Sequence, residues 1–489
     1  MNSNIIPPLP EIEWSRRGSV NLYRTERLPL GEMSFFKDWV STTCGDPYPL
    51  ASKIGAPREC VGGGRYSVQL SLEESLSRVI GAHFPFASYE IRIAELSGAS
   101  VGIELSGGPL CRALLSENCV QLLTDDGESR FEVDTADIVS MTVSFRTDGV
   151  SVYLRRDGID TPVCDIDAPS LAEYRCESVM HKAKACLCIT SSAGGVCTLS
   201  GVEAYVSGGI SQADLRPMRY ENGEPIIEGG RVFLTASARC EKLRYQIVLS
   251  LCPTLFDLRM EGAMFYSYGD GYIHGDVAPT VIYDRNAGLW RLWIWSLAHG
   301  HILAYSDSFS DPRYGISIID ARLMERAHDD APVEAPLARK GDEDPELIFI
   351  DGVWHFAVCR SDTDGTYHYF HFTSDRPDGG FVYKDKTAGG EKTGGSFVKT
   401  PEGVYFVCGS DFGKTSVYDV YPLDDFSTPT SPIVDLRDGG FRGWGSMFLV
   451  PCGSRHKYVW ITFDRHGGSS FRWSYGNIYI FESAPFRIK

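Results

Sequence analysis

Short runs in which apolar and polar residues alternate follow one another along most of the chain. Residues 66–72, 89–94 and 141–154 show this two-residue period, and glycine, asparagine or proline ends many of the runs. A period of two places apolar side chains on one face of a β-strand, whereas an amphipathic helix needs a period of about 3.6 residues. No long run with the helical period interrupts the strands, so the pattern predicts an all-β protein.

Five segments in the second half of the chain repeat one pattern, in which an apolar strand, a turn and an aromatic-rich strand follow one another. They begin near Pro225, Pro279, Pro345, Gly395 and Gly445, roughly 50 to 65 residues apart. This spacing suits a four-stranded propeller blade with its loops, and five units in series disfavour a pair of stacked sheets. Residues 211–489 are therefore predicted to form a five-bladed β-propeller whose innermost strands start at these positions.

Residues 1–210 lack this repeat. Their short strands and glycine-rich turns, including a hairpin that turns at Asp148 and Gly149, predict a β-sandwich. The segment resembles the jelly rolls of the concanavalin and laminin-G type that accompany carbohydrate-active enzymes. Residues 207–217 are expected to connect the two domains.

The net charge, the first residues and the length of the apolar runs argue against several partners and locations. The net charge is −17, which argues against nucleic acid and against an anionic membrane surface, because both bind clustered Lys and Arg. The first residues lack a basic segment followed by an apolar one, and no apolar run reaches about 18 residues. We therefore expect a cytoplasmic protein without a membrane span.

The chain contains 14 cysteines, and they lie scattered within apolar strands, as Cys186, Cys188 and Cys408 do. This placement is typical of buried, reduced thiols rather than of a disulfide framework. No Cys-x-x-Cys pair occurs, which argues against a structural zinc site.

Acidic residues stand just before most of the predicted blade openings: Glu224, Asp276, Glu343, Asp344 and Glu391. The innermost strands of a propeller begin at one end of its channel, so these carboxylates should converge there. Crowded carboxylates repel one another and their pKa values separate, which yields the acid and the base that glycosidic cleavage requires. Such a funnel could also hold a structural Ca²⁺ ion; otherwise no cofactor is expected.

Two of these openings carry a resemblance to a known group of enzymes. Residues 341–356 (GDEDPELIFIDGVWHF) and 274–284 (HGDVAPTVIYD) resemble the blade-opening motifs of five-bladed glycoside hydrolases, the families around family 43 and the levansucrase and invertase families. The resemblance implies an Asp base or nucleophile, an orienting Asp and a Glu acid on successive blades.

Asp276, Asp344 and Glu391 match these three roles in order, and Glu224, Asp276 and Glu343 form the alternative set. The first set is preferred because its first member is an Asp. The segment around Glu391 departs from the Glu-x-Pro pattern of the family, and this weakens the assignment of the acid more than the other two.

Further residues could bind the sugar. Trp444 could stack on a ring, and His274, Arg442, Arg465, His466 and Glu224 could bind its hydroxyl or acidic groups. His299 and His301 could form half of a metal site, but no third ligand is evident in the sequence, so no metal site is predicted.

These observations predict a glycoside hydrolase that acts on oligosaccharides, with exo action preferred over endo action. The separation of the two carboxyl groups would decide between retention and inversion of configuration. A glycoside phosphorylase that uses Arg442, Arg465 and His466 for phosphate, and a glycan-binding propeller without catalysis, are the alternatives.

Overall fold

The computed structural model describes residues 9, 12–20, 26–30, 58–61, 65–70, 74–209, 211–239, 244–325, 332–335, 341–409, 417–430, 434–435, 444–463 and 477–488. Strands dominate these residues, and their longest helical elements are the 3-10 helix η4 (Pro169–Arg175) and the helix α1 (Glu177–Met180). The predicted all-β class is confirmed. Within the described residues, no helix is long and apolar enough to cross a membrane.

The chain divides into two compact units. One, the N-terminal unit, comprises Arg27–Ser207 and Gly271–Ile273; the other, the propeller unit, comprises Met1–Glu26, Gly208–Asp270 and His274–Lys489. The N-terminal unit is therefore inserted into the chain of the propeller unit. The sequence-based division had assigned all of residues 1–210 to the first domain, but residues 1–26 group with the propeller unit.

The N-terminal unit contains two antiparallel sheets, one in the order β10-β9-β8-β7-β14-β5 and the other in the order β13-β12-β11-β6-β15-β4-β3, with β2 paired to β15. The predicted hairpin is present, because β11 (Ser140–Arg146) pairs with β12 (Gly149–Arg156) across the turn at Asp148. The concanavalin-like connectivity stays a prediction. The other strands are β2 (Arg27–Pro29), β3 (Arg58–Val61), β4 (Arg65–Leu70), β5 (Glu74–Ala82), β6 (Ala87–Ser97), β7 (Ser100–Ser106), β8 (Cys111–Leu115), β9 (Cys119–Thr124), β10 (Gly127–Glu132), β13 (Ile159–Asp167), β14 (Lys184–Ser191) and β15 (Gly195–Ser207).

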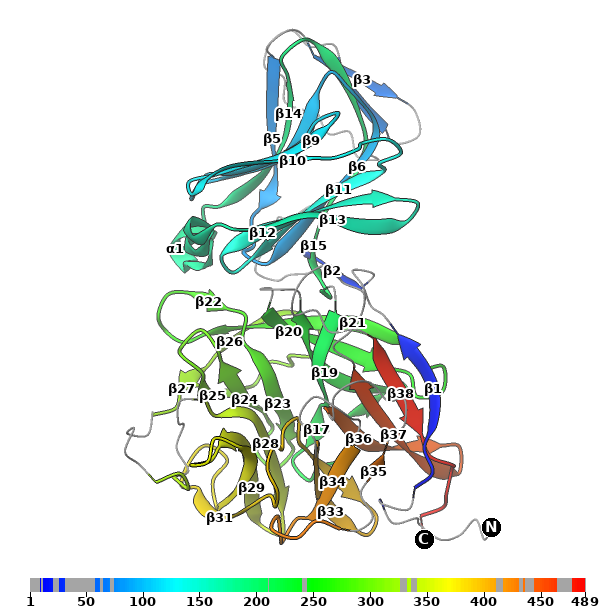
Figure 1. Cartoon of the computed structure of the whole chain (residues 1–489), viewed down its shortest axis with the longest axis vertical. Helices are drawn as coiled ribbons and strands as arrows, with labels where there is room; N and C mark the ends of the chain where they lie inside the picture. The colour runs from blue at the N-terminus through cyan, green and yellow to red at the C-terminus, as the bar shows by residue number, and fades with distance from the viewer. Residues whose placement is uncertain are drawn as a thin grey trace. The chain divides into compact units, whose positions relative to one another are not determined.

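Five sheets make up the described part of the propeller unit (Figure 1). Their main strands, from the inside outwards, are β16 (Ser211–Pro217), β19 (Arg231–Arg239), β20 (Arg244–Leu251) and β21 (Leu258–Ser267); β23 (Val277–Asp284), β24 (Leu289–Ser296), β25 (Ile302–Ser308) and β27 (Arg322–Leu323); β28 (Glu343–Ile350), β29 (Val353–Ser361), β30 (Tyr367–Ser374) and β31 (Val382–Lys386); β32 (Ser396–Thr400), β33 (Gly403–Gly409), β34 (Val417–Pro422) and β35 (Val434–Asp435); β36 (Gly445–Cys452), β37 (Arg455–Phe463), β38 (Ile478–Glu482) and β1 (Ser15–Val20). The short strands β17 (Arg219–Tyr220), β18 (Ile227–Glu228), β22 (Ile273–His274) and β26 (Gly315–Asp320) extend the first two sheets.

The inner strands of the five sheets form a closed ring. Each of β16, β23, β28, β32 and β36 contacts the next in sequence order, and β36 contacts β16. The chain thus ends in a β-propeller, as predicted.

Apolar side chains fill the spaces between neighbouring sheets. Trp293 of the second sheet packs with Phe356 of the third, and Phe397 of the fourth sheet lies in a cluster with Ile348 of the third. A sheet of the propeller packs against a neighbour on each side, so its strands bury apolar side chains on both faces, as the nearly continuous burial along β20 and β23 shows.

The N-terminal strand completes the fifth sheet. Strand β1 pairs antiparallel with β38, so residues near the two ends of the chain share the fifth sheet, where Figure 1 shows β1 in blue beside β38 in red. Leu9 and Ile12 also enter the buried cluster between the fourth and fifth sheets.

One predicted blade opening is wrong. Pro225 does not start an inner strand; it lies in the loop that joins β17 to β18, and the inner strand of the first sheet is β16. Residues 207–217, which we expected to be a connection, therefore contain the inner strand itself. The other four inner strands begin within two residues of the predicted positions.

Candidate active site

Three inner strands share a β-bulge. The register of pairing shifts between Ala213 and Arg216 in β16, between Val277 and Thr280 in β23, and between Glu343 and Glu346 in β28. At each shift one residue has a left-handed backbone, with φ of 54° at Asp214, 51° at Ala278 and 50° at Asp344. A bulge redirects a side chain relative to the regular strand.

These positions are equivalent in the three sheets, and two of them are aspartates. Asp214 and Asp344 line one cavity of about 500 Å³ together with Glu343, the residue before the bulge of β28. Three carboxyl groups from two sheets therefore meet in one cavity. Its volume is in the range of small-molecule binding sites.

Arg216 holds one of the three carboxylates. This buried guanidinium lies 3.2 Å from Asp344 Oδ1 through Nη2, and its Nη1 donates a hydrogen bond to the carbonyl of Pro345 at 3.0 Å. Its Nε lies 3.5 Å from Glu346 Oε1, and Glu346 is also paired with Arg219. The cation thus compensates for the charge of Asp344 and ties the first sheet to the third.

Glu343 has a different environment. Its pKa is raised to about 8, chiefly because burial removes water from the carboxylate, and next because Asp344 and Asp214 repel its negative charge. The nearest sulfur, Cys359 Sγ, is 3.9 Å from Glu343 Oε1. Glu343 therefore keeps its proton at neutral pH beside Asp344, which is paired with a cation.

Asp214 accepts a hydrogen bond from a buried hydroxyl group. Ser237 donates a hydrogen bond to Asp214 Oδ2 at 2.7 Å, and Ser237 itself is fully buried. Asp214 also lines the cavity.

Aromatic side chains form much of the remaining wall. Trp295, Tyr367 and Trp444 line the cavity, with Arg244 and His301 among the polar groups. Gly394 packs directly on Trp444: a Cβ at Gly394 would lie 2.6 Å from Cδ1 of the indole, and its φ is 62°. The glycine-rich segment before β32 thus makes room for Trp444, which had been predicted to contact the sugar.

The structure buries Asp276, the first member of the preferred catalytic set. Asp276 is 1% exposed and is not among the residues that line the cavity. Tyr268 donates a hydrogen bond to its Oδ2 at 2.6 Å, and the backbone N–H groups of Leu297 and Ala298 donate to its Oδ1 at 2.8 and 3.3 Å. These contacts favour a structural role.

Two other predicted carboxylates also lie outside the cavity lining. Glu391 is half-buried in the segment before β32, with φ of 59°. Glu224 is half-exposed near Lys399 and borders a separate cavity of about 330 Å³. It lies in the loop between β17 and β18, whereas Asp214 lies in the middle of β16.

Of the other predicted substrate ligands, His274 is buried and its Nε2 lies 2.8 Å from Asp270 Oδ2. Arg442, Arg465 and His466 lie outside the described residues. Asp214 and Arg216 were not predicted. A signal for Asp214 exists, because it precedes Pro217 by three residues, as Asp276 precedes Pro279.

No protein-family model matches the chain, and no curated protein matches it. Among solved structures, a family 117 glycoside hydrolase from Zobellia galactanivorans is similar over 56% of this chain and 90% of its own, at 11% identity and a TM-score of 0.36. The α-L-arabinofuranosidase PaAbf62A from Podospora anserina is similar over 57% of this chain and 92% of its own, at 10% identity and a TM-score of 0.35.

A family 43 enzyme from Xanthomonas citri is similar over 63% of this chain and 82% of its own, at 10% identity and a TM-score of 0.27. The resemblance to family 43 that the blade-opening motifs indicated thus has a counterpart among the structures similar to this chain. The likeness concerns the fold.

Proposed function

We propose that the chain is a glycoside hydrolase that cleaves short oligosaccharides in the cavity of Asp214, Glu343 and Asp344. The observation that carries the proposal is the environment of Glu343, a carboxyl group whose pKa of about 8 keeps it protonated next to two further carboxyl groups. Glycosidic cleavage needs such a pair of an acid and a base.

Glu343 acts as the general acid in this proposal and protonates the oxygen of the leaving sugar. Asp214 acts at the anomeric carbon of the sugar that is cleaved off, either as the nucleophile or as the base that activates the attacking water. Asp344, held by Arg216, stabilises the positive charge that develops on the sugar ring in the oxocarbenium-like transition state.

The walls of the cavity suit a sugar. Trp295, Tyr367 and Trp444 offer faces on which the apolar side of a sugar ring packs, while Arg244 and His301 offer polar groups for its hydroxyls. A volume of about 500 Å³ accommodates a short sugar chain, which supports exo action on oligosaccharides.

The test is a panel of oligosaccharides and of aryl glycosides with good leaving groups, assayed for new reducing ends with the wild type and with Glu343→Gln. We expect the variant to lose turnover of oligosaccharides by about 10²–10⁴-fold. It should keep much more activity on the aryl glycosides, because a good leaving group departs without a proton.

Running the panel with and without inorganic phosphate separates the alternatives. Turnover that requires phosphate and yields a sugar phosphate would identify a phosphorylase. Binding of a glycan without turnover of any substrate on the panel would identify a binding protein. Either result would refute hydrolysis.

A further inference from the structure

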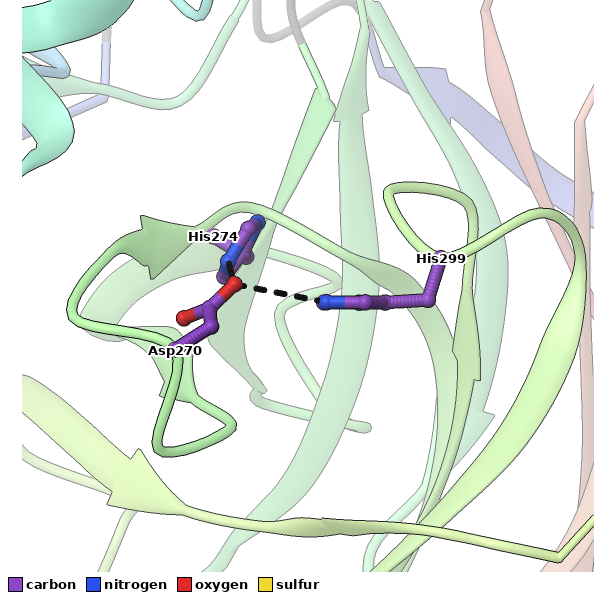
Figure 2. Close-up of side chains that lie close together, drawn as sticks. All are labelled: Asp270, His274 and His299. Carbon is purple, nitrogen blue, oxygen red and sulfur yellow. Dashed lines mark hydrogen bonds and ion pairs between the residues drawn. The ribbon is translucent and has the colours of Figure 1, made fainter.

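Three potential metal ligands meet on the first two sheets of the propeller unit, apart from the carboxyl groups of the cavity. Asp270 lies in the loop between β21 and β22, His274 ends β22, and His299 lies in the turn between β24 and β25. Figure 2 shows the carboxylate of Asp270 lying between the two imidazole rings.

The donor atoms are already close to the spacing that a metal ion imposes. Asp270 Oδ2 is 2.8 Å from His274 Nε2 and 3.3 Å from His299 Nε2, and all three ligand atoms lie within 4.8 Å of one another. An ion with bonds of about 2.0–2.2 Å to nitrogen and oxygen brings neighbouring donor atoms to roughly 3–3.5 Å apart. Small side-chain rotations therefore suffice to coordinate an ion.

Neighbouring residues orient the two histidines. His299 Nδ1 lies 3.1 Å from Oγ of the fully buried Ser296, so its Nε2 faces Asp270. Metal-binding histidines typically use one ring nitrogen for the ion and the other for a hydrogen bond of this kind. Tyr268 packs against both imidazoles, with ring centroids 5.4 Å from His274 and 4.7 Å from His299.

Asp276 supports the same cluster through hydrogen bonds to its neighbours. One of its oxygens accepts a hydrogen bond from the Tyr268 hydroxyl. The other accepts hydrogen bonds from the backbone N–H groups of Leu297 and Ala298, which lead into the turn that carries His299. Because Asp276 is buried, these bonds hold the tyrosine and the turn in place. The cluster therefore stands on a preorganised framework.

We propose that Asp270, His274 and His299 bind a divalent transition-metal ion of the Zn²⁺ class. Two imidazoles and one carboxylate favour such ions over Ca²⁺ and Mg²⁺, which prefer sites made only of oxygen ligands. Three protein ligands leave at least one coordination position for water or another small ligand. The site does not depend on the proposed hydrolase function.

Binding would restrain one part of the cavity wall. The turn that carries His299 also carries Leu297 and His301, and both line the cavity of about 500 Å³. His301 is thus directed to the cavity, while His299 faces Asp270. The ligands that accompany His299 are thus Asp270 and His274, and not the nearby His301.

The test uses the full chain freed of metal by a chelator and titrated with Zn²⁺, and with Co²⁺ as a spectroscopic substitute. We expect the wild type to bind a single tight equivalent and its melting temperature to rise on binding. His299→Gln and Asp270→Asn should each weaken that binding by at least about tenfold and remove the rise. His301→Gln, the matched control in the same turn, should bind like the wild type.

Asp270 is partly exposed, so Asp270→Asn should fold, and its melting temperature in the presence of chelator verifies this. Wild-type affinity in both His299→Gln and Asp270→Asn would overturn the proposal, as would the absence of a tight equivalent in the wild type. Loss of binding in His301→Gln alone would also overturn it.

Discussion

Glu343 and Asp344 are neighbours in sequence, but their carboxyl groups lie in electrostatically different environments. Asp344 lies 3.2 Å from the guanidinium of Arg216, whereas Glu343 is desolvated and faces two carboxyl groups. Attraction to a cation favours the ionised form, and burial beside like charges favours the protonated form. Two adjacent positions at the bulge therefore place one carboxyl group beside a cation and the other among like charges.

The pH dependence of turnover follows from the raised pKa of Glu343. A general acid must carry its proton, so kcat/KM should fall tenfold per pH unit once the pH exceeds the pKa of about 8. In Glu343→Gln the residual kcat/KM should show no such fall in that range. A wild-type rate that stays constant well above this pKa would remove Glu343 from the acid role.

Stability should depend on pH through the same group. The unfolded chain loses the Glu343 proton near the ordinary value of 4.5, but the folded protein keeps it until about 8. The contribution of Glu343 is therefore fully present below about 4.5 and is lost as the pH rises towards 8. Denaturant unfolding between these pH values should show a smaller decline in Glu343→Gln than in the wild type.

Asp276 provides a second test at this scale. Asp276→Ala removes the acceptor of three hydrogen bonds that are only partly buried, so the melting temperature should fall, by less than if the donors were fully buried, where each unpaired donor costs about 1–3 kcal/mol. Asp276→Asn keeps an acceptor for the two backbone N–H groups and should retain turnover well below its melting temperature. Loss of turnover at an unchanged melting temperature would instead assign a catalytic role to Asp276.

At the scale of elements, three inner strands repeat the same β-bulge with different residues. The bulge position holds Asp214 in the first sheet, Ala278 in the second and Asp344 in the third. A left-handed backbone is costly for residues other than glycine, so its recurrence indicates a position that the fold constrains. The first and third sheets use it for carboxylates, and the second does not.

The fifth sheet depends on a strand from the beginning of the chain. Trp14, just before β1, meets the buried Trp460 edge to face, with ring centroids 5.3 Å apart. Trp14→Ala should lower the free energy of unfolding by about 3 kcal/mol, the lower end for a packed aromatic residue. Phe309→Ala, at a side chain that is 87% exposed, is the control and should change it by less than about 0.5 kcal/mol. Equal effects in chemical denaturation would show that the segment before β1 does not stabilise the propeller.

At the scale of the whole molecule, the N-terminal unit is an insertion between neighbouring residues of the propeller unit. Gly208 donates a backbone hydrogen bond to the carbonyl of Glu26 at 2.9 Å, so the chain leaves and returns at one place. The four described apolar clusters between the propeller sheets contain no residue of Arg27–Ser207. The propeller unit thus has its own core.

Replacing residues 27–207 by a short glycine linker between Glu26 and Gly208 should therefore leave a folded propeller. Cooperative thermal unfolding and unchanged turnover of a small glycoside are the expected results, because the cavity is lined by propeller residues alone. A chain of residues 208–489, which lacks β1, is the matched comparison and should melt at a lower temperature. Equal melting temperatures would contradict the role of β1 in completing the fifth sheet.

Local sequence determined the elements of this protein. The alternation of apolar and polar residues sets strands over a few residues at a time, and proline and glycine mark their ends, so the openings near Pro279, Pro345, Gly395 and Gly445 could be predicted. The first opening was wrongly placed near Pro225, because the actual inner strand β16 lies in a segment whose Gly and Ser residues are typical of a linker.

Tertiary structure decided the chemistry. Whether an acidic residue faces the cavity depends on the bulges and on the closing of the ring, so Asp214 joined Glu343 and Asp344 while Asp276 was buried. The proton on Glu343 depends on desolvation and on charges from another sheet. His299 likewise met Asp270 and His274 across two sheets. Periodicity reflects backbone geometry over neighbouring residues, but burial and electrostatic coupling join residues far apart in the chain, and these interactions exist only once the propeller has closed.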